Sequence, residues 1–324
     1  MSSTSSTSTP GGSAPTAQRL LLLDTASLYF RAFFGVKDLR EAPDGTPTNA
    51  VRGLLDMIAT LVRRFEPSHL VACWDNDWRP EFRVSAIPSY KAHRLVPGTQ
   101  DEEEAPPELE AQVPIIRRAL EAVGIPLVGV DGYEADDVIG TLTALHKDRM
   151  PVSVVTGDRD LFQLVDDEAD VTVVYTARGG VRDAEVIREA DLQERYGIPT
   201  GAAYADMAIL RGDTSDGLPG VKGIGDKTAA QLISTYGSLA ALRQALADGD
   251  PAIKGARRTN LEAAAAYLDV APLVVTVAPD VPVPDVPLTV PRELADPETL
   301  QQLVDSYDLG SPVGRLMQAL SLQP

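Results

Sequence analysis

The sequence predicts an α/β fold in which helices flank a mainly parallel central sheet, followed by a second, mostly helical part. Short runs of continuous apolar residues alternate with stretches of helical periodicity through the first half of the chain. This alternation is typical of a sheet whose faces are covered by helices. Toward residue 200 the runs cease, and the chain becomes helix-rich and alanine-rich. We therefore expect an α/β domain over residues 18–200 and a helical domain over residues 201–324.

Five apolar runs are candidate strands. Each is apolar at successive positions, which indicates a strand that is buried on both faces and hence belongs to a parallel sheet. Three of the runs end in a carboxylate, at Asp24, Asp75 and Asp158. The candidate strands lie at residues 19–24, 70–75, 127–130, 152–158 and 171–175.

Helical periodicity is clearest between the first two candidate strands. Apolar residues recur there with the i, i+3, i+4, i+7 spacing of one helix face. They are Val51, Leu54, Leu55, Ile58, Leu61, Val62 and Phe65. A second pattern of the same kind follows an acidic start, at Val138, Ile139, Leu142 and Leu145.

Three segments depart from this pattern. Residues 1–17 are nearly all Ser, Thr, Gly, Pro and Ala, so we expect a disordered tail. Residues 281–290 are rich in proline, and we expect them to be extended. Residues 76–107 combine several basic residues with an acidic, proline-rich run. A long insertion after a strand end is more often a functional lid than padding.

The composition excludes several classes of protein. With 44% apolar residues in 324, the chain can bury a core, and no apolar run approaches the roughly 20 residues that span a membrane. A single cysteine, Cys73, excludes intramolecular disulfides and a cysteine zinc site. We therefore expect a cytoplasmic protein. The formal charge of −18 argues at first sight against nucleic acid, because phosphate binding normally leaves a basic footprint.

Nine carboxylates stand at positions where they could converge. In open α/β sheets, ligands bind beyond the carboxyl ends of the strands. Acidic residues occupy three such ends, the first turn of a helix and a glycine-bounded loop. The nine residues are Asp24, Asp75, Glu134, Asp136, Asp137, Asp158, Asp160, Asp213 and Asp216.

Converging carboxylates need a counter-charge, and the sequence offers no matching set of nine lysines or arginines. Hard divalent cations, Mg²⁺ or Mn²⁺, are natural neutralisers of oxygen ligands. So many ligands indicate more than one ion and therefore two-metal phosphoryl chemistry. Any one of these acids, taken alone, is more often a turn residue or a helix cap. Only their joint occurrence favours a metal site.

Four motifs resemble those of the 5′-nuclease (flap endonuclease) family, in the form that is fused to bacterial DNA polymerase I. They are LLD at 22–24, GYEADDVIG at 132–140, TGDRDL at 156–161 and GDTSDGLPGVKGIG at 212–225. The resemblance runs from about Leu20 to past Tyr236 and implies a PIN-like nuclease core. Because the chain stops where the polymerase would begin, it resembles a free-standing nuclease.

The resemblance also implies the role of the nine acids. Asp24, Asp75, Glu134, Asp136 and Asp137 match the family's first metal group. Asp158, Asp160, Asp213 and Asp216 match its second metal group. In the family, two or more Mg²⁺ or Mn²⁺ ions activate a water and stabilise an in-line phosphodiester displacement.

The insertion at 76–107 resembles the family's helical arch, which gates a single-stranded 5′ end. The resemblance implies that Lys91 and Arg83 place catalytic cations on the scissile phosphate, that Tyr90 stacks on an unpaired base and that Arg94 contacts DNA. Without the resemblance, this basic run would be interpreted as a solvent-exposed face. Departing from the family, Asn76-Asp77-Trp78 follows Asp75 where Ala-Lys-Gly is usual, so one basic residue is missing.

Two further elements match DNA contacts of the family. Phe30-Arg31 corresponds to an aromatic–arginine pair whose arginine contacts phosphate. The turn at 220–225, which leads into residues 226–236, corresponds to a helix-turn-helix element that holds duplex DNA, often through K⁺. Taken alone, it would be a glycine-rich helix connection. The implied contacts are Gly220, Val221, Gly223, Ile224, Gly225, Lys227 and Thr228.

The resulting hypothesis is a structure-specific 5′-flap endonuclease and 5′–3′ exonuclease that acts in replication, on RNA primers and flaps, and in repair. Its substrates would be 5′ flaps, nicked or gapped duplexes and RNA-primed ends. We expect a monomer in the nucleoid with a functional link to DNA polymerase I and ligase. Metal ions would offset nine of the acids, which answers the objection from net charge.

Two alternatives remain at this point. A ribonuclease of the small PIN-type fold would lack both the arch and the helix-turn-helix element. A structure-selective DNA-binding subunit with an inactive site would not need all nine carboxylates.

Overall fold

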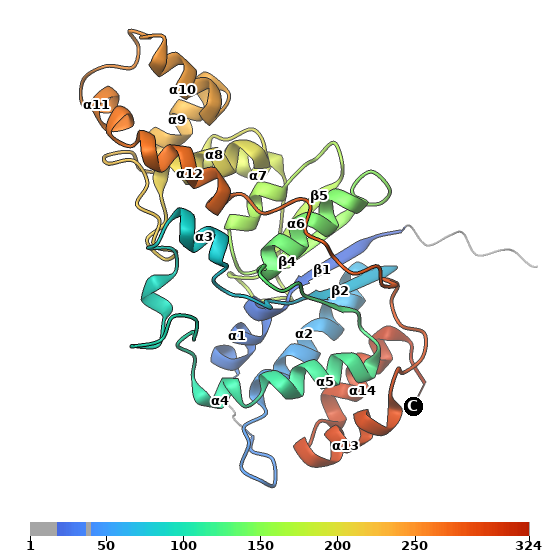
Figure 1. Ribbon diagram of the computed structural model, residues 1–324. Coiled ribbons are helices and arrows are strands. Elements are labelled where there is room, and N and C mark those ends of the chain that lie inside the picture. The colour runs from blue at the N-terminus through green and yellow to red at the C-terminus, as the bar shows by residue number, and fades with distance from the viewer. Residues whose placement is uncertain (1–17, 37–39, 324) are drawn as a thin grey trace, which may run out of the picture.

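The computed structural model describes residues 18–36 and 40–323; the predicted disordered tail, residues 1–17, lies outside this range. A six-stranded sheet with the order β3-β2-β1-β4-β5-β6 lies between helices (Figure 1). All five predicted strands are present and mutually parallel. They are β1 (Leu20–Asp24), β2 (His69–Cys73), β3 (Leu127–Val128), β4 (Val152–Thr156) and β5 (Val171–Tyr175).

A sixth strand, β6 (Glu185–Ile187), pairs with β5 in the antiparallel direction. The sequence analysis missed this strand because it is short and only Ile187 is fully buried. The remaining sheet confirms the prediction of a mainly parallel α/β fold.

Both faces of the sheet are covered, as the continuous apolar runs predict. Leu20 and Leu22 of β1 point into one core, and Leu21 and Leu23 point into the other. The second core contains α1 (Thr25–Gly35), α2 (Asn49–Phe65) and α5 (Val113–Val123). The first core contains α6 (Ala135–His146), the 3-10 helix η2 (Asp160–Leu164) and α8 (Gly201–Arg211).

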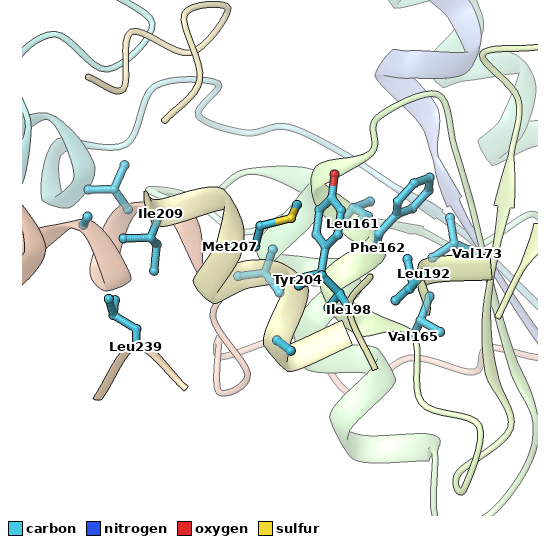
Figure 2. Packing of buried hydrophobic residues seen from close by; sticks show 14 of the residues in the cluster. Leu161, Phe162, Val165, Val173, Leu192, Ile198, Tyr204, Met207, Ile209 and Leu239 are labelled. Carbon is cyan, nitrogen blue, oxygen red and sulfur yellow. The ribbon is translucent and has the colours of Figure 1, made fainter. Parts of the chain in front are cut away.

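The helical part shares the first core with the sheet. The Tyr204 ring of α8 lies 5.5 Å from the Phe162 ring of η2, measured between centroids, and Met207 and Leu192 pack beside them (Figure 2). The helical part contains α8, α9 (Asp226–Tyr236), α10 (Leu239–Ala247), α11 (Gly255–Ala263) and α12 (Ala265–Val275), and α7 (Glu189–Tyr196) directly precedes it. The helices beyond residue 200 are therefore anchored to the sheet by a continuous apolar core.

The last two helices return to the α/β part. After an extended tract, in which the Leu70 amide of β2 donates to the Leu288 carbonyl at 2.9 Å, α13 (Pro297–Tyr307) and α14 (Gly310–Leu320) pack against α5 and α2 (Figure 1). The expected division at residue 200 stays a prediction, but the last helices belong to the core of the first part. Composition could not reveal this, because helical periodicity does not say which surface a helix covers.

The insertion at 76–107 contains α3 (Glu81–Ala86) and the 3-10 turn η1 (Ala92–Arg94), and it ends where α4 (Pro107–Glu110) begins. Most of it lies to one side of the carboxyl ends of the strands. Among the described residues, no helix has the length and apolar character needed to cross a membrane.

The return of α14 to the sheet generates a stability prediction. Leu316 of α14 is fully buried in the core that contains α2, so Leu316→Ala should lower the free energy of unfolding by about 2–5 kcal/mol. Leu145 of α6 is 52% exposed, and Leu145→Ala should cost less than about 0.5 kcal/mol. Urea denaturation measures both. Equal losses for the two variants would contradict the packing of α14 on α2.

Candidate active site

Three acidic side chains, those of Asp24, Asp75 and Asp158, meet at the carboxyl ends of β1, β2 and β4. Asp24 ends β1 and caps α1, and its carboxylate accepts hydrogen bonds from the Ser27 amide at 3.1 Å and the Thr156 hydroxyl at 2.6 Å. Asp75 accepts from the Ala135 amide at 2.8 Å, which ties the segment after β2 to the start of α6. The parallel register of the strands therefore brings their terminal acids to one edge of the sheet.

The three acids of the GYEADDVIG motif lie at the start of α6. Glu134 caps the helix, and the Asp137 carboxylate accepts from the Glu134 amide at 3.2 Å, which forms a capping box. Asp136 lies one residue earlier than Asp137 and faces the strand ends. Negative charge is favoured at this position because the free amides of a helix N-terminus carry partial positive charge.

Four carboxylates share one cavity without a cationic partner. Asp24, Asp75, Asp136 and Asp158 line a cavity of about 630 Å³. Among residues 18–36 and 40–323, no lysine or arginine forms an ion pair with any of the four. In the described part of the protein, their mutual repulsion is therefore reduced only by cations at a greater distance: Lys91 lines the same cavity, and its charge acts to lower the pKa of Asp75 and Asp136.

Burial and repulsion raise the pKa values of Asp24, Asp75 and Asp136. Burial, opposed by the Thr156 hydrogen bond and assisted by the charges of Asp75 and Asp158, raises the pKa of Asp24 to about 7. Burial, then the charges of Asp24 and Asp158, raise the pKa of Asp136 well above its usual range. The four groups are close enough to resist joint ionisation.

The other five acids lie within 4.0 Å of basic side chains. Lys91 Nζ lies 2.6 Å from Glu134 Oε2, and Arg94 Nη2 lies 2.6 Å from Asp216 Oδ1. The remaining contacts are Arg83 with Asp137 at 2.7 Å, Arg159 with Asp213 at 3.2 Å, Arg211 with Asp213 at 3.4 Å and Arg211 with Asp160 at 4.0 Å.

Arg83 does not reach the cavity. It is 2% exposed, its Nη1 and Nη2 both donate to the Asp137 carboxylate at 2.7 Å, and its Nε donates to the Val274 carbonyl at 3.0 Å. The contact of Arg83 with a scissile phosphate stays a prediction; in this structure its guanidinium lies between Asp137 and Glu134, with Nη1 3.4 Å from Glu134 Oε1. The Arg83–Asp137 pair joins the insertion to α6 and α12.

Tyr90 is buried as well. It is 4% exposed, and its hydroxyl donates to Glu134 Oε1 at 2.8 Å, so its ring is not available for an unpaired base. The stacking role stays a prediction that would require Tyr90 to leave this position. Lys91 does line the cavity, and its ammonium donates both to Glu134 and to the Trp78 carbonyl, at 3.2 Å.

The aromatic–arginine pair lies beside the cavity. Phe30 lines it and stacks on Tyr29, with 5.3 Å between ring centroids. Arg31 donates to the Ala177 carbonyl at 3.3 Å from a half-buried position.

The glycine-rich turn lies between α8 and α9. Gly220 and Gly223 have φ values of +64° and +75°, which favour glycine. Val221 and Ile224 are buried, so their side chains hold the turn in the core, and only their backbone is left for DNA. Gly225 and Lys227 are exposed and Thr228 is half-buried. The side-chain amide of Asn260, in α11, donates to the Lys222 carbonyl at 2.7 Å.

The sequence analysis missed Arg159, Arg211 and Asn260. A signal was present for the two arginines: Arg159 stands between Asp158 and Asp160, and Arg211 directly precedes the GDTSDG segment. A cation inside a run of acids indicates local charge compensation. Asn260 has no such signal, because its partner is a backbone carbonyl 38 residues away.

The donor set fits hard divalent cations. The four cavity acids offer only oxygen ligands, and burial and neighbouring carboxylates raise the pKa of Asp24, Asp75 and Asp136, so a bound cation would favour their ionised form. As the side chains stand, no three acids, histidines or cysteines of the described residues form a closed metal site. The side chains would therefore have to adjust around an ion.

Fold and site together define a nuclease, a hydrolase that acts on phosphodiester bonds. The chain belongs to the 5′–3′ exonuclease family: residues 19–197 match its N-terminal resolvase-like domain and residues 199–298 match its C-terminal SAM fold. This confirms the family and the fold class that the motifs predict.

Relatives include both free and fused proteins. A 5′–3′ exonuclease of Streptomyces coelicolor is 54% identical over 93% of this chain and all of its own length. DNA polymerase I of Mycobacterium bovis is 37% identical over 95% of this chain, which spans 33% of the polymerase. A crystal structure of the bacteriophage T5 flap endonuclease with DNA and metal ions is 18% identical, with a TM-score of 0.64 over 94% of this chain and all of that one. At that identity, the last comparison shows the shared fold.

The raised pKa values generate a prediction for the protein without divalent ions. Asp24 and Asp160, with pKa values of about 7 and about 8, hold protons in the folded state that an unfolded aspartate loses near pH 4. The free energy of unfolding should therefore fall as the pH rises from about 5.5 to about 8.5.

Differential scanning fluorimetry in EDTA measures this fall, with the Asp160→Asn variant as the control whose slope should be shallower. Millimolar Mn²⁺ should restore the melting temperature at the higher pH, because ions that bind the native state stabilise it. A melting temperature that is insensitive both to pH and to Mn²⁺ would contradict the electrostatic account of the site.

Proposed function

We propose that the protein cuts DNA at or near 5′ ends and 5′ flaps, and that divalent ions, Mg²⁺ or Mn²⁺, bind at the cavity formed by Asp24, Asp75, Asp136 and Asp158. The observation that carries this proposal is the group of four acids without cationic partners in the described chain, beside the Lys91 ammonium. Metal ions at such a site activate water and stabilise the attacking and leaving oxygens of a phosphodiester.

The protein's own groups prepare this cavity. The Thr156 hydroxyl and the Ser27 amide fix the Asp24 carboxylate, and the Ala135 amide fixes Asp75. Lys91 supplies a cation on the cavity wall, where it can meet negative charge that develops on a phosphate. Phe30 offers an aromatic surface at the same cavity, which suits stacking on a base at the 5′ end.

The second group of acids has a related role in this proposal. Asp160, Asp213 and Asp216 lie next to Arg211, Arg159 and Arg94. These arginines lower the local density of negative charge, so the segment can lie beside the phosphates of a substrate. Glu134 and these three acids remain candidate ligands of a second ion. The Arg83–Asp137 pair holds the insertion in place.

Duplex binding is assigned to the turn at 220–225. Lys222 and Lys227 are exposed, and in the described chain neither forms an ion pair. Free cations beside exposed backbone are suited to the phosphates of one strand. A potassium ion at this turn stays a prediction.

The biological setting is proposed from the relatives. Removal of RNA primers and flaps during replication, a role in repair and a link to DNA polymerase I would suit a chain that is 37% identical to part of that polymerase. The monomeric state, the link to ligase and the nucleoid location stay predictions. No specific observation favours the PIN-type ribonuclease, and the binding subunit with an inactive site is tested by the next experiment.

Asp136→Asn should lower single-turnover cleavage of a 5′-labelled flap duplex in Mg²⁺ by more than about 100-fold, since it removes a cavity carboxylate. Binding of the same duplex in Ca²⁺ should be unchanged or tighter, because one negative charge near phosphates is lost. Asp148→Asn, at an exposed position outside the cavity, is the matched control and should cleave normally. Full activity of Asp136→Asn, or an inactive wild-type protein, would overturn the proposed function.

Gly223→Val should weaken binding of flap and nicked duplexes by about 10-fold or more, because a branched side chain intrudes where backbone must approach phosphate and where φ is positive. It should spare the slow cleavage of a short single strand. Gly249, with φ +78° and open space around it, provides the control Gly249→Val. If Gly223→Val loses activity equally on both substrates while it remains folded, the turn is not a separate duplex-binding element.

A further inference from the structure

The segment that carries Lys91 is docked on the loop that carries Asp216. The Lys91 amide donates to the Asp216 carbonyl at 2.9 Å. The Ser89 hydroxyl donates to the Gly217 carbonyl at 2.7 Å, and Arg94 Nη2 donates to the Ser215 carbonyl at 3.0 Å. With the contact of Arg94 Nη2 to Asp216 Oδ1 at 2.6 Å, four hydrogen bonds join residues 89–94 to residues 215–217. Figure 1 shows the loop between α8 and α9 beside the insertion.

Gly217 permits this close approach. Its φ is +70°, and a Cβ atom at this position would overlap the Ser89 carbonyl oxygen and lie 2.9 Å from the Ser89 carbonyl carbon. Both are backbone atoms, so no side-chain rotation can relieve the overlap. Any other residue at 217 must push the two segments apart.

The docking sets the backbone from which the Lys91 side chain projects. Lys91 has φ +49°, a conformation that residues other than glycine adopt only when their surroundings enforce it. Its amide is held by Asp216, and its ammonium contacts Glu134 and the Trp78 carbonyl on the cavity wall. If residues 89–91 were released, this strained conformation would relax and the ammonium would no longer be fixed at the cavity.

We propose that Gly217 and Ser89 are positioning residues, which dock the Lys91 segment on the Asp216 loop so that the ammonium is held at the cavity before a substrate binds. The inference rests on the proposed function for its catalytic consequence. The docking itself does not depend on that function. Fixing a charged group in advance removes the cost of ordering it during the reaction.

The docking of the two segments is tested by hydrogen exchange of the metal-free protein, measured at the backbone amide of Lys91. Gly217→Ala should speed exchange of the Lys91 amide by about 10-fold or more, because its hydrogen bond to Asp216 opens. Gly197 has φ +71°, and a Cβ atom added there would have no neighbour within 4 Å. Gly197→Ala therefore imposes the same backbone strain without a clash and should leave Lys91 protected. Unchanged protection in Gly217→Ala would overturn the docking.

The effect of the docking on catalysis is tested by single-turnover cleavage of a 5′-flap duplex in Mg²⁺, measured alongside binding of the same duplex in Ca²⁺. Gly217→Ala should slow cleavage by about 10- to 100-fold and change binding by less than about 3-fold. Ser89→Ala, which adds no atoms, should slow cleavage in the same direction by a smaller factor. Added to Lys91→Ala, Gly217→Ala should cost less than about 3-fold, because the group it positions is already absent.

Each outcome has a distinct meaning. If Gly217→Ala costs as much in the Lys91→Ala background as in the wild type, the docking does not act through Lys91 and the inference is wrong. If Lys91→Ala cleaves normally while Asp136→Asn does not, the positioning role is likewise overturned, but the proposed function stands. If the wild type cleaves no flap duplex, the proposed function fails, and the exchange experiment still decides whether the segments are docked.

Discussion

Repulsion between carboxylates at one edge of the sheet is the constraint on which the rest of the structure depends. Parallel strands place Asp24, Asp75 and Asp158 at neighbouring ends, and α6 adds Glu134 and Asp136 in its first turn. Burial and the neighbouring carboxylates raise the pKa values of Asp24 and Asp136, and repulsion would favour opening of the site unless positive charge is supplied. The described residues supply it to Glu134 through a direct ion pair with Lys91, and no such pair reaches the four cavity acids.

The cations that supply this charge also connect the additional elements to the sheet. Arg83, Lys91 and Arg94 come from the insertion at 76–107, Arg159 comes from the loop between β4 and η2, and Arg211 ends α8 of the helical part. Breaking a buried pair such as Arg83–Asp137 would leave an uncompensated charge in the core, which is strongly destabilising. The same contacts therefore hold the insertion close to the cavity and limit how far it can move. In this way, the electrostatic needs of the site and the arrangement of the elements are coupled.

Much of the fold could be predicted because it rests on local patterns. The five apolar runs became the parallel strands, and the periodicity at 51–65 became α2. The meeting of strand-end acids followed from topology alone. The Arg83–Asp137 ion pair could not be predicted, since the two residues are 54 positions apart and pair through tertiary packing. For the same reason, a family motif could not reveal that Tyr90 is buried against Glu134, or that α14 covers α2.

The central claim is that the unpaired cavity acids hold the tightest divalent ion and that Asp137, paired with Arg83, does not. Isothermal titration of Mn²⁺ into the wild type, Asp136→Asn and Asp137→Asn tests it most directly, with circular dichroism to verify that each variant is folded. Asp136→Asn should weaken the tightest site by about 10-fold or more, and Asp137→Asn should leave it within about 3-fold, because Arg83 already occupies that carboxylate. Equal losses in two folded variants, or a loss confined to Asp137→Asn, would contradict the account.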